Sequence, residues 1–185
     1  MCFRTVLLLF VFLHVGFAQS ETNPLPSKLG MLTLGAPLPQ GVFDSSFDLN
    51  QGKRLSTYDA REPIARKMWR SLSPNLDNEN TVAVVSTFKC LVVSVDFYMY
   101  KIRFPEVIAV LTSRYGRPRL KDIPESESSP HLKHWTWKDK NETLLVAAEP
   151  ESLQWELTYQ VFHVTIWSNR LYDSARRSGV FDVEE

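Results

Sequence analysis

Residues 104–118, FPEVIAVLTSRYGRP, decide how this chain is expected to fold. An apolar stripe recurs through this segment at the spacing of one helix face, and it consists of Phe104, Val107, Ile108, Leu111 and Tyr115. Pro105 suits a first helical turn, Gly116 suits the left-handed position after the last turn, and Pro118 prevents continuation. The unusual residues are therefore explained by a helix over 104–115 rather than by an active site.

The segments on either side of this helix have the period of β-strands. Before it, the odd positions from 91 to 99 are apolar, while Ser94, Asp96 and Tyr98 alternate with them, which predicts a strand over 91–100. A polar loop is expected over 121–130. Three further extended segments come after it, over 131–138, 143–148 and 153–161. The apolar parity then shifts to Phe162, Val164 and Ile166, which predicts a bulge or break near 161. Ser168 can cap a short terminal helix that carries Leu171 and Ala175. The order predicts an α+β fold, in which a strand, helix 104–115 and a three-strand antiparallel meander form a sheet with the helix on one face.

The chain before residue 91 predicts a smaller helix and extended pieces. Apolar residues recur at helical spacing within 58–72, where Pro63 suits the first turn and Pro74 ends the helical segment. Residues 82–85 are extended, and 19–57 are rich in turn-forming residues.

The expected organisation is a signal peptide over 1–18, a loop-rich segment over 19–57, a single α+β domain over 58–178 and a frayed acidic tail over 179–185. A degenerate duplication with 28–100 as its first half is left open.

The N-terminus predicts export. Arg4 precedes an apolar run that is too short to span a membrane, and Gly16-Phe17-Ala18 provides small residues at a cleavage site. The mature protein is expected to begin near Gln19, without membrane insertion after signal cleavage, and to be periplasmic or secreted.

Charge and cysteine content restrict the function classes. The chain has 21 Lys and Arg against 21 Asp and Glu, so nothing favours nucleic acid as a partner. Cys90 is the one cysteine after the predicted signal peptide, so an intramolecular disulfide is excluded, and its apolar neighbours predict a buried thiol.

No catalytic motif is present, so the prediction leans away from an enzyme, with no catalytic residue and no cofactor. His131, His134 and His163 could suggest a metal site, but residues three apart on a strand point to opposite faces, and no metal is expected. Trp135 and Trp137 share the apolar parity of the core.

The candidate binding residues lie on the sheet face away from helix 104–115. Asp96, Tyr98 and Tyr100 would share that face with His134 and Thr136 if strands 91–100 and 132–138 are neighbours. Exposed tyrosines beside polar groups suit protein recognition. Alternatively, the N-terminal helix within 58–72 covers Tyr98 and Tyr100.

These observations favour an exported, non-enzymatic protein that binds another protein, of the inhibitor, immunity or envelope-accessory type. The alternative is a carbohydrate-binding protein or a hydrolase with a dispersed site. Residues 91–160 resemble small exported bacterial proteins in which a helix ending in Tyr-Gly-x-Pro precedes Trp-bearing strands, and this resemblance implies no activity. The sequence leaves the partner's identity and the oligomeric state open.

Overall fold

The structure is a computed structural model that describes residues 23–39, 44–45, 55–60, 62–77, 81–99, 104–124, 132–148 and 162–179. The strands are β1 (Lys28–Leu29), β2 (Leu32–Thr33), β3 (Asp44–Ser45), β4 (Ser56–Ala60), β5 (Val82–Phe88), β6 (Leu91–Met99), β7 (Arg119–Ile123), β8 (Leu132–Lys138), β9 (Glu142–Ala148) and β10 (Phe162–Ser168). The helices are α1 (Ile64–Leu72), α2 (Phe104–Tyr115) and α3 (Asn169–Arg177).

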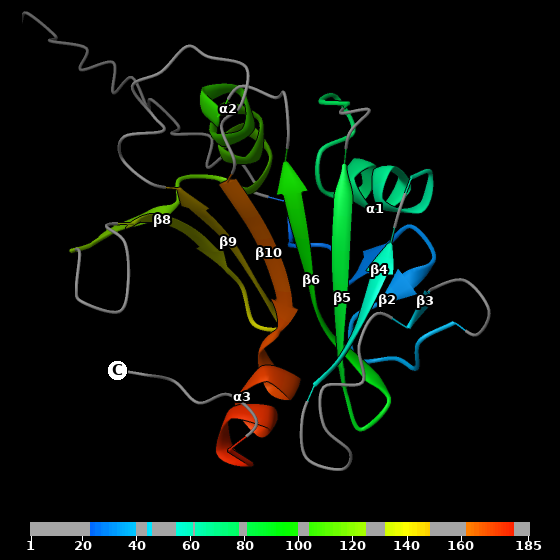
Figure 1. Ribbon diagram of the computed structural model, residues 1–185. Helices are drawn as coiled ribbons and strands as arrows, with labels where there is room; N and C mark the ends of the chain where they lie inside the picture. Colours follow the sequence, from blue (N-terminus) through cyan, green and yellow to red (C-terminus); the bar gives the residue numbers. More distant parts are fainter. Residues whose placement is uncertain are drawn as a thin grey trace, which may run out of the picture.

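One antiparallel sheet organises the described chain, with strand order β3-β4-β5-β6-β10-β9-β8-β7 (Figure 1). The short strands β1 and β2 pair separately. In each half of the large sheet the strands follow chain order from the edge inward, and the halves meet where β6 pairs with β10. The predicted α+β class, with an antiparallel sheet, the meander and helix 104–115 on one face, is confirmed.

The two helices α1 and α2 pack on the same face of this sheet. Trp69 of α1 lies edge-on to Phe97 of β6, with ring centroids 5.6 Å apart. Phe104 of α2 lies edge-on to Phe162 of β10 at 5.2 Å. The helices are also joined to each other, because the Tyr115 hydroxyl donates a 2.8 Å hydrogen bond to the Leu72 carbonyl. We call this the helix side of the sheet.

Helix α2 has the predicted bounds and the predicted stop. Four residues of its stripe are buried, namely Phe104, Val107, Leu111 and Tyr115. Gly116 has φ +82°, which only glycine adopts without strain, and its N–H donates to the Thr112 carbonyl at 2.9 Å. The apolar stripe therefore packs against the sheet as the periodicity predicts.

Strands β4 and β7 were not predicted, and both lie toward the edges of the sheet. Residues 58–60 belong to β4, so α1 begins only at Ile64, after Pro63. Residues 121–123, expected in a polar loop, form part of β7 beside β8. A strand near the edge of a sheet can expose both of its faces to water. Its sequence then lacks the alternation of apolar and polar residues by which a strand is recognised.

A bulge shifts the burial pattern of β6. Its register with β5 changes between Ser86 and Thr87, which pair with Ser94 and Val92 and leave Val93 as an extra residue. The expected odd parity therefore holds for residues 95, 97 and 99 but not at the start of the strand. Val92 joins the main core, whereas Val93 packs in a second cluster with α3.

The prediction of a buried Cys90 is wrong. Lys89 and Cys90 both have positive φ, +53° and +62°, and form the tight turn between β5 and β6. Both residues are exposed. The sequence shows no sign of this turn, because Lys-Cys is not a customary turn pair. The apolar neighbours of Cys90 therefore indicated burial, although the residue lies at the tip of a hairpin.

Helix α3 follows β10 at the end of the sheet opposite α1 and α2 (Figure 1). Its start at Asn169, after Ser168, and its packed residues Leu171 and Ala175 are as predicted. The predictions for residues 1–18, Tyr100, 153–161 and 180–185 lie outside the described residues. Within the described segments, none of the helices has both the length and the apolar character that crossing a membrane requires.

Candidate functional site

The sheet face opposite α1 and α2, which we call the open face, is built from rows of residues paired across the strands. One row runs Val82, Tyr98, His163, Ala147, His134 and Lys121. The next runs Asp59, Val84, Asp96, Thr165, Leu145, Thr136 and Arg119. Directly opposed residues of antiparallel strands point to the same side, so these rows share one face. Most of their side chains are half-buried or exposed.

An aromatic and polar group lies at the centre of this face, where β6 pairs with β10. Tyr98 and His163 are directly opposed, and their rings meet edge-on with centroids 4.7 Å apart. Beside them, the Thr165 hydroxyl donates to the Asp96 carboxylate at 2.5 Å. We call Asp96, Tyr98, His163 and Thr165 the central group.

The electrostatics of this group follow from partial burial. Removal from water raises the pKa of Asp96, while the hydrogen bond from Thr165 and the neighbouring His163 act in the opposite direction. His163 itself is exposed. The central group therefore combines a shielded carboxyl with an accessible imidazole and a phenol, which is a surface suited to polar and aromatic contacts.

His134 lies on the same face but not beside Tyr98. The sequence prediction placed His134 beside Asp96 and Tyr98 only if their strands were neighbours. Strands β10 and β9 separate β8 from β6, so this condition is not met. His134 instead pairs with Ala147 on one side and Lys121 on the other. Burial, and secondarily the charge of Lys121, lowers the pKa of His134.

The tyrosines of β6 were expected either on a free face or beneath the N-terminal helix. Tyr98 is half-buried and lies on the open face, whereas α1 packs on the other side of the sheet against Phe97. Helix α1 therefore does not cover Tyr98. Tyr100 lies outside the described residues.

Charge is distributed unevenly across the open face. Arg119, Lys121 and Lys138 are exposed at the end formed by β7 and β8. Asp59 and Asp96 lie on the other half, on β4 and β6. Although the chain has equal numbers of basic and acidic residues, one end of the open face is therefore cationic.

The histidines do not form a metal site in the described part of the chain. His134 and His163 are in one row, but β9 lies between their strands, which places them about 10 Å apart. No group of three or more His, Cys, Asp or Glu side chains within the described segments could hold a metal ion. His131 lies outside these segments.

Sequence reasoning missed His163 and Thr165 as members of the face. The signal was present, because Phe162, Val164 and Ile166 are the apolar positions of this segment. The residues between them must then face the other way. The sequence did not reveal that β10 inserts between β6 and β9, since strand order depends on long-range pairing.

A pair of carboxyl groups in the turn between β8 and β9 was also missed. Asp139 accepts hydrogen bonds from the backbone N–H groups of Leu25, Asn141 and Glu142, at 2.9, 2.8 and 2.8 Å. Burial and the adjacent Asp139 raise the pKa of Glu142. Because the Asp139 carboxylate is engaged by three backbone donors, its evident role is to hold the turn against the N-terminal segment.

Comparison with known proteins yields no match, neither to a protein-family model nor to a curated protein or a solved structure.

Proposed function

We propose that the protein is exported and acts without catalysis, by binding another protein through the open face, as an inhibitor, immunity factor or envelope accessory does. The observation that carries this proposal is the central group, where Tyr98 and His163 meet on the sheet face opposite α1 and α2. Tyrosine offers a large contact area with little rotamer entropy to lose.

Charge complementarity specifies the chemistry of the partner. Arg119, Lys121 and Lys138 at one end of the face favour acidic groups on the partner, opposite β7 and β8. Exposed charges of this kind act mainly on the association rate and on orientation. The central group would supply the contacts that slow dissociation.

The face also argues against a metal-dependent or nucleophilic reaction as the first hypothesis. His163, the accessible imidazole of the central group, lies against Tyr98, and the neighbouring carboxyl of Asp96 is bonded to Thr165. A nucleophile held by a base, the arrangement that acyl transfer needs, is not assembled by the central group.

The test compares captured proteins between the wild-type protein and variants of the open face. The mature protein is expressed with export, cross-linked in place and purified, and its partners are identified by mass spectrometry. Tyr98→Ala with His163→Ala should abolish capture of a specific acidic protein, and Lys121→Glu should slow its association. Met31→Ala is the matched control, since Met31 is an exposed apolar residue outside the face, in the β1–β2 turn.

Capture that is insensitive to the open-face variants would contradict the assignment of the face. The absence of any protein partner, together with binding to glycans that the double variant weakens, would favour the carbohydrate-binding alternative instead. N-terminal sequencing tests export separately, because the exported protein should begin at or near Gln19 rather than at Met1.

A further inference from the structure

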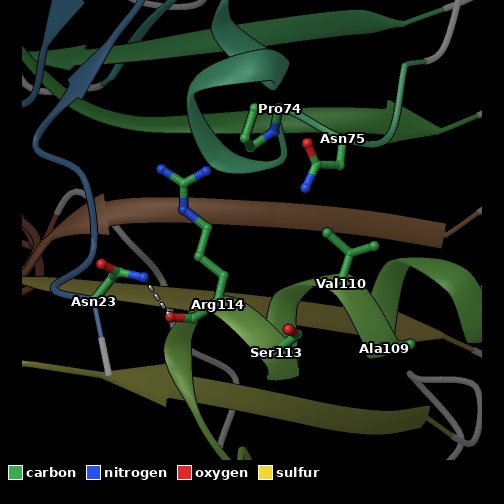
Figure 2. Close-up of a pocket in the computed structure, with 7 residues that line it drawn as sticks. All are labelled: Asn23, Pro74, Asn75, Ala109, Val110, Ser113 and Arg114. Atoms are coloured by element: carbon green, nitrogen blue, oxygen red, sulfur yellow. Dashed lines mark hydrogen bonds between the residues drawn. The ribbon is translucent and has the colours of Figure 1, made fainter. Parts of the chain in front are cut away.

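A cleft of about 470 Å³ lies on the helix side of the sheet, between the end of α1 and the second half of α2. Pro74 and Asn75 line it from the segment after α1, and Ala109, Val110, Ser113 and Arg114 line it from α2. In Figure 2 the side chain of Arg114 extends across the cleft toward Pro74, with Asn75 and Ser113 on the same side of the arginine.

Arg114 is held in place by its backbone and by its neighbour. Its carbonyl accepts hydrogen bonds from both the backbone N–H and the side-chain amide of Asn23, each 3.2 Å long (Figure 2). Its guanidinium carbon lies 5.4 Å from the centre of the Tyr115 ring. Tyr115 is in turn bonded to the end of α1 through the Leu72 carbonyl. The guanidinium is therefore positioned before any ligand arrives.

One nitrogen of this guanidinium has no partner among the described residues. The Nε of Arg114 is shielded from solvent and makes no hydrogen bond there. Leaving such a donor buried and unpaired is unfavourable, so it indicates that an acceptor belongs beside it. The residues that line the cleft include no Asp or Glu, so the cleft wall supplies no carboxylate to this guanidinium.

The lining specifies the acceptor's chemistry. A guanidinium presents paired donors that match the two oxygens of a carboxylate, and Arg114 is the one cation among the lining residues, which suits a monoanion better than a phosphate dianion. The Ser113 hydroxyl and the Asn75 amide add polar contacts, while Ala109 and Val110 provide an apolar wall. We propose that this cleft binds an organic carboxylate with a short aliphatic part, paired to Arg114.

Such a carboxylate could be a free small acid or the C-terminal end of a peptide, and the two share this chemistry. Two probes distinguish the sources: propionate represents the free acid, and N-acetyl-L-alanine represents a peptide end. The Nε–H signal of Arg114 in nitrogen-15-labelled protein reports directly on the donor. Saturable shifts of this signal with either carboxylate support the site, and tighter binding of N-acetyl-L-alanine would identify a peptide end.

The controls remove the carboxylate or the donor. N-acetyl-L-alaninamide, which lacks the carboxylate, should bind the wild-type protein at least about tenfold more weakly than N-acetyl-L-alanine does. N-acetyl-L-alanine should bind Arg114→Gln more weakly by a similar factor. Arg117→Gln is the matched variant, because Arg117 is an exposed arginine near the same helix end that does not line the cleft. The Arg117→Gln variant should bind the carboxylate with the affinity of the wild type.

A second variant protects the test against loss of folding in Arg114→Gln. Ala109→Phe leaves Arg114 intact and fills the cleft from an exposed position, so it should also weaken binding. The proposal is overturned if the Arg114 signal does not saturate, if the amide binds as well as the acid, or if inorganic phosphate binds more tightly than both acids. Because the cleft lies on the helix side, this inference does not rest on the function proposed for the open face.

Discussion

The two faces of the sheet differ in what they contact and in what they can do. On the helix side, inward residues such as Phe97, Val146 and Val164 are fully buried, and α1 and α2 cover them. On the open face, the residues that alternate with them remain half-buried or exposed and carry charge and hydroxyl groups. The helix side therefore contains the main core, while the open face is the one proposed for recognition, so substitutions on the two faces should have separable effects.

The largest expected effect is on the helix side. Leu111→Ala removes a fully buried side chain between α2 and the sheet, and it should lower the free energy of unfolding by about 2–5 kcal/mol. Denaturant unfolding measures this. An unchanged unfolding midpoint would contradict the assignment of this stripe to the core, because the stripe of α2 would then be a binding surface.

A smaller loss is expected where the two helices are joined. Tyr115→Phe removes the hydroxyl that bonds to the Leu72 carbonyl, and leaving that acceptor unpaired should cost about 1–3 kcal/mol. Burial raises the pKa of Tyr115 to about 12. Since the folded protein then holds this proton more tightly than the unfolded chain, the wild type should lose stability as pH rises above about 10 toward 12.

The phenylalanine variant should lack that alkaline loss. Urea unfolding of both proteins at pH 8 and at higher pH separates the two effects, because the hydrogen-bond loss is present at every pH. If the stability of the two proteins depends on pH in the same way, the pKa of Tyr115 is the same in the folded and unfolded states.

On the open face the expected change is one of pH dependence. The folded pKa of Asp96 is raised above 3.8, so its contribution to stability is complete below that pH and is lost as the pH rises through the folded pKa. Asp96→Asn should therefore make the free energy of unfolding less dependent on pH in the acid range. The asparagine side chain can still accept the hydrogen bond from Thr165. Thr165→Val should steepen it, since the hydrogen bond lowers the pKa of Asp96.

These variants test whether the open face also contributes to the stability of the fold. Thermal unfolding across pH 3–7 provides the measurement. A wild type that gains stability relative to Asp96→Asn as the pH rises would give the opposite sign and contradict the assignment.

The smallest effect is expected at the cationic end. Lys121→Ser changes an exposed side chain of an edge strand and should alter the free energy of unfolding by less than about 0.5 kcal/mol. The same change should slow association with an acidic partner, measured by stopped flow at low salt. A large loss of stability with normal association would place Lys121 among the structural residues.

Periodicity predicted the elements whose burial is one-sided. The bounds of α2, the core parity of Trp135 and Trp137, and the inward positions of β10 follow from the sequence alone, since each has an apolar face and a polar one. Strand β7 and the turn at Cys90 were missed, because an edge strand needs no apolar face and a two-residue turn depends on backbone torsions.

The candidate site was predicted in part. Asp96, Tyr98 and His134 share the expected face, but the residue that meets Tyr98 is His163, because β10 rather than β8 lies beside β6. That neighbour was hidden by the order of strands, which no local pattern encodes. The Arg114 cleft was hidden for the same reason, since its walls come from α2 and from the segment after α1, which are distant in the chain.

The pairing of β6 with β10 has a consequence for how the chain folds. Thr165 and Asp96, bonded across this pair, are 69 residues apart in sequence, whereas the hairpins β5–β6 and β8–β9 close through short turns. Closing a long loop costs chain entropy before any contact compensates for it, so contacts distant in sequence slow folding. We expect the hairpins of each half to form early, and the central pair of strands, which creates the face proposed for binding, to form close to the rate-limiting step.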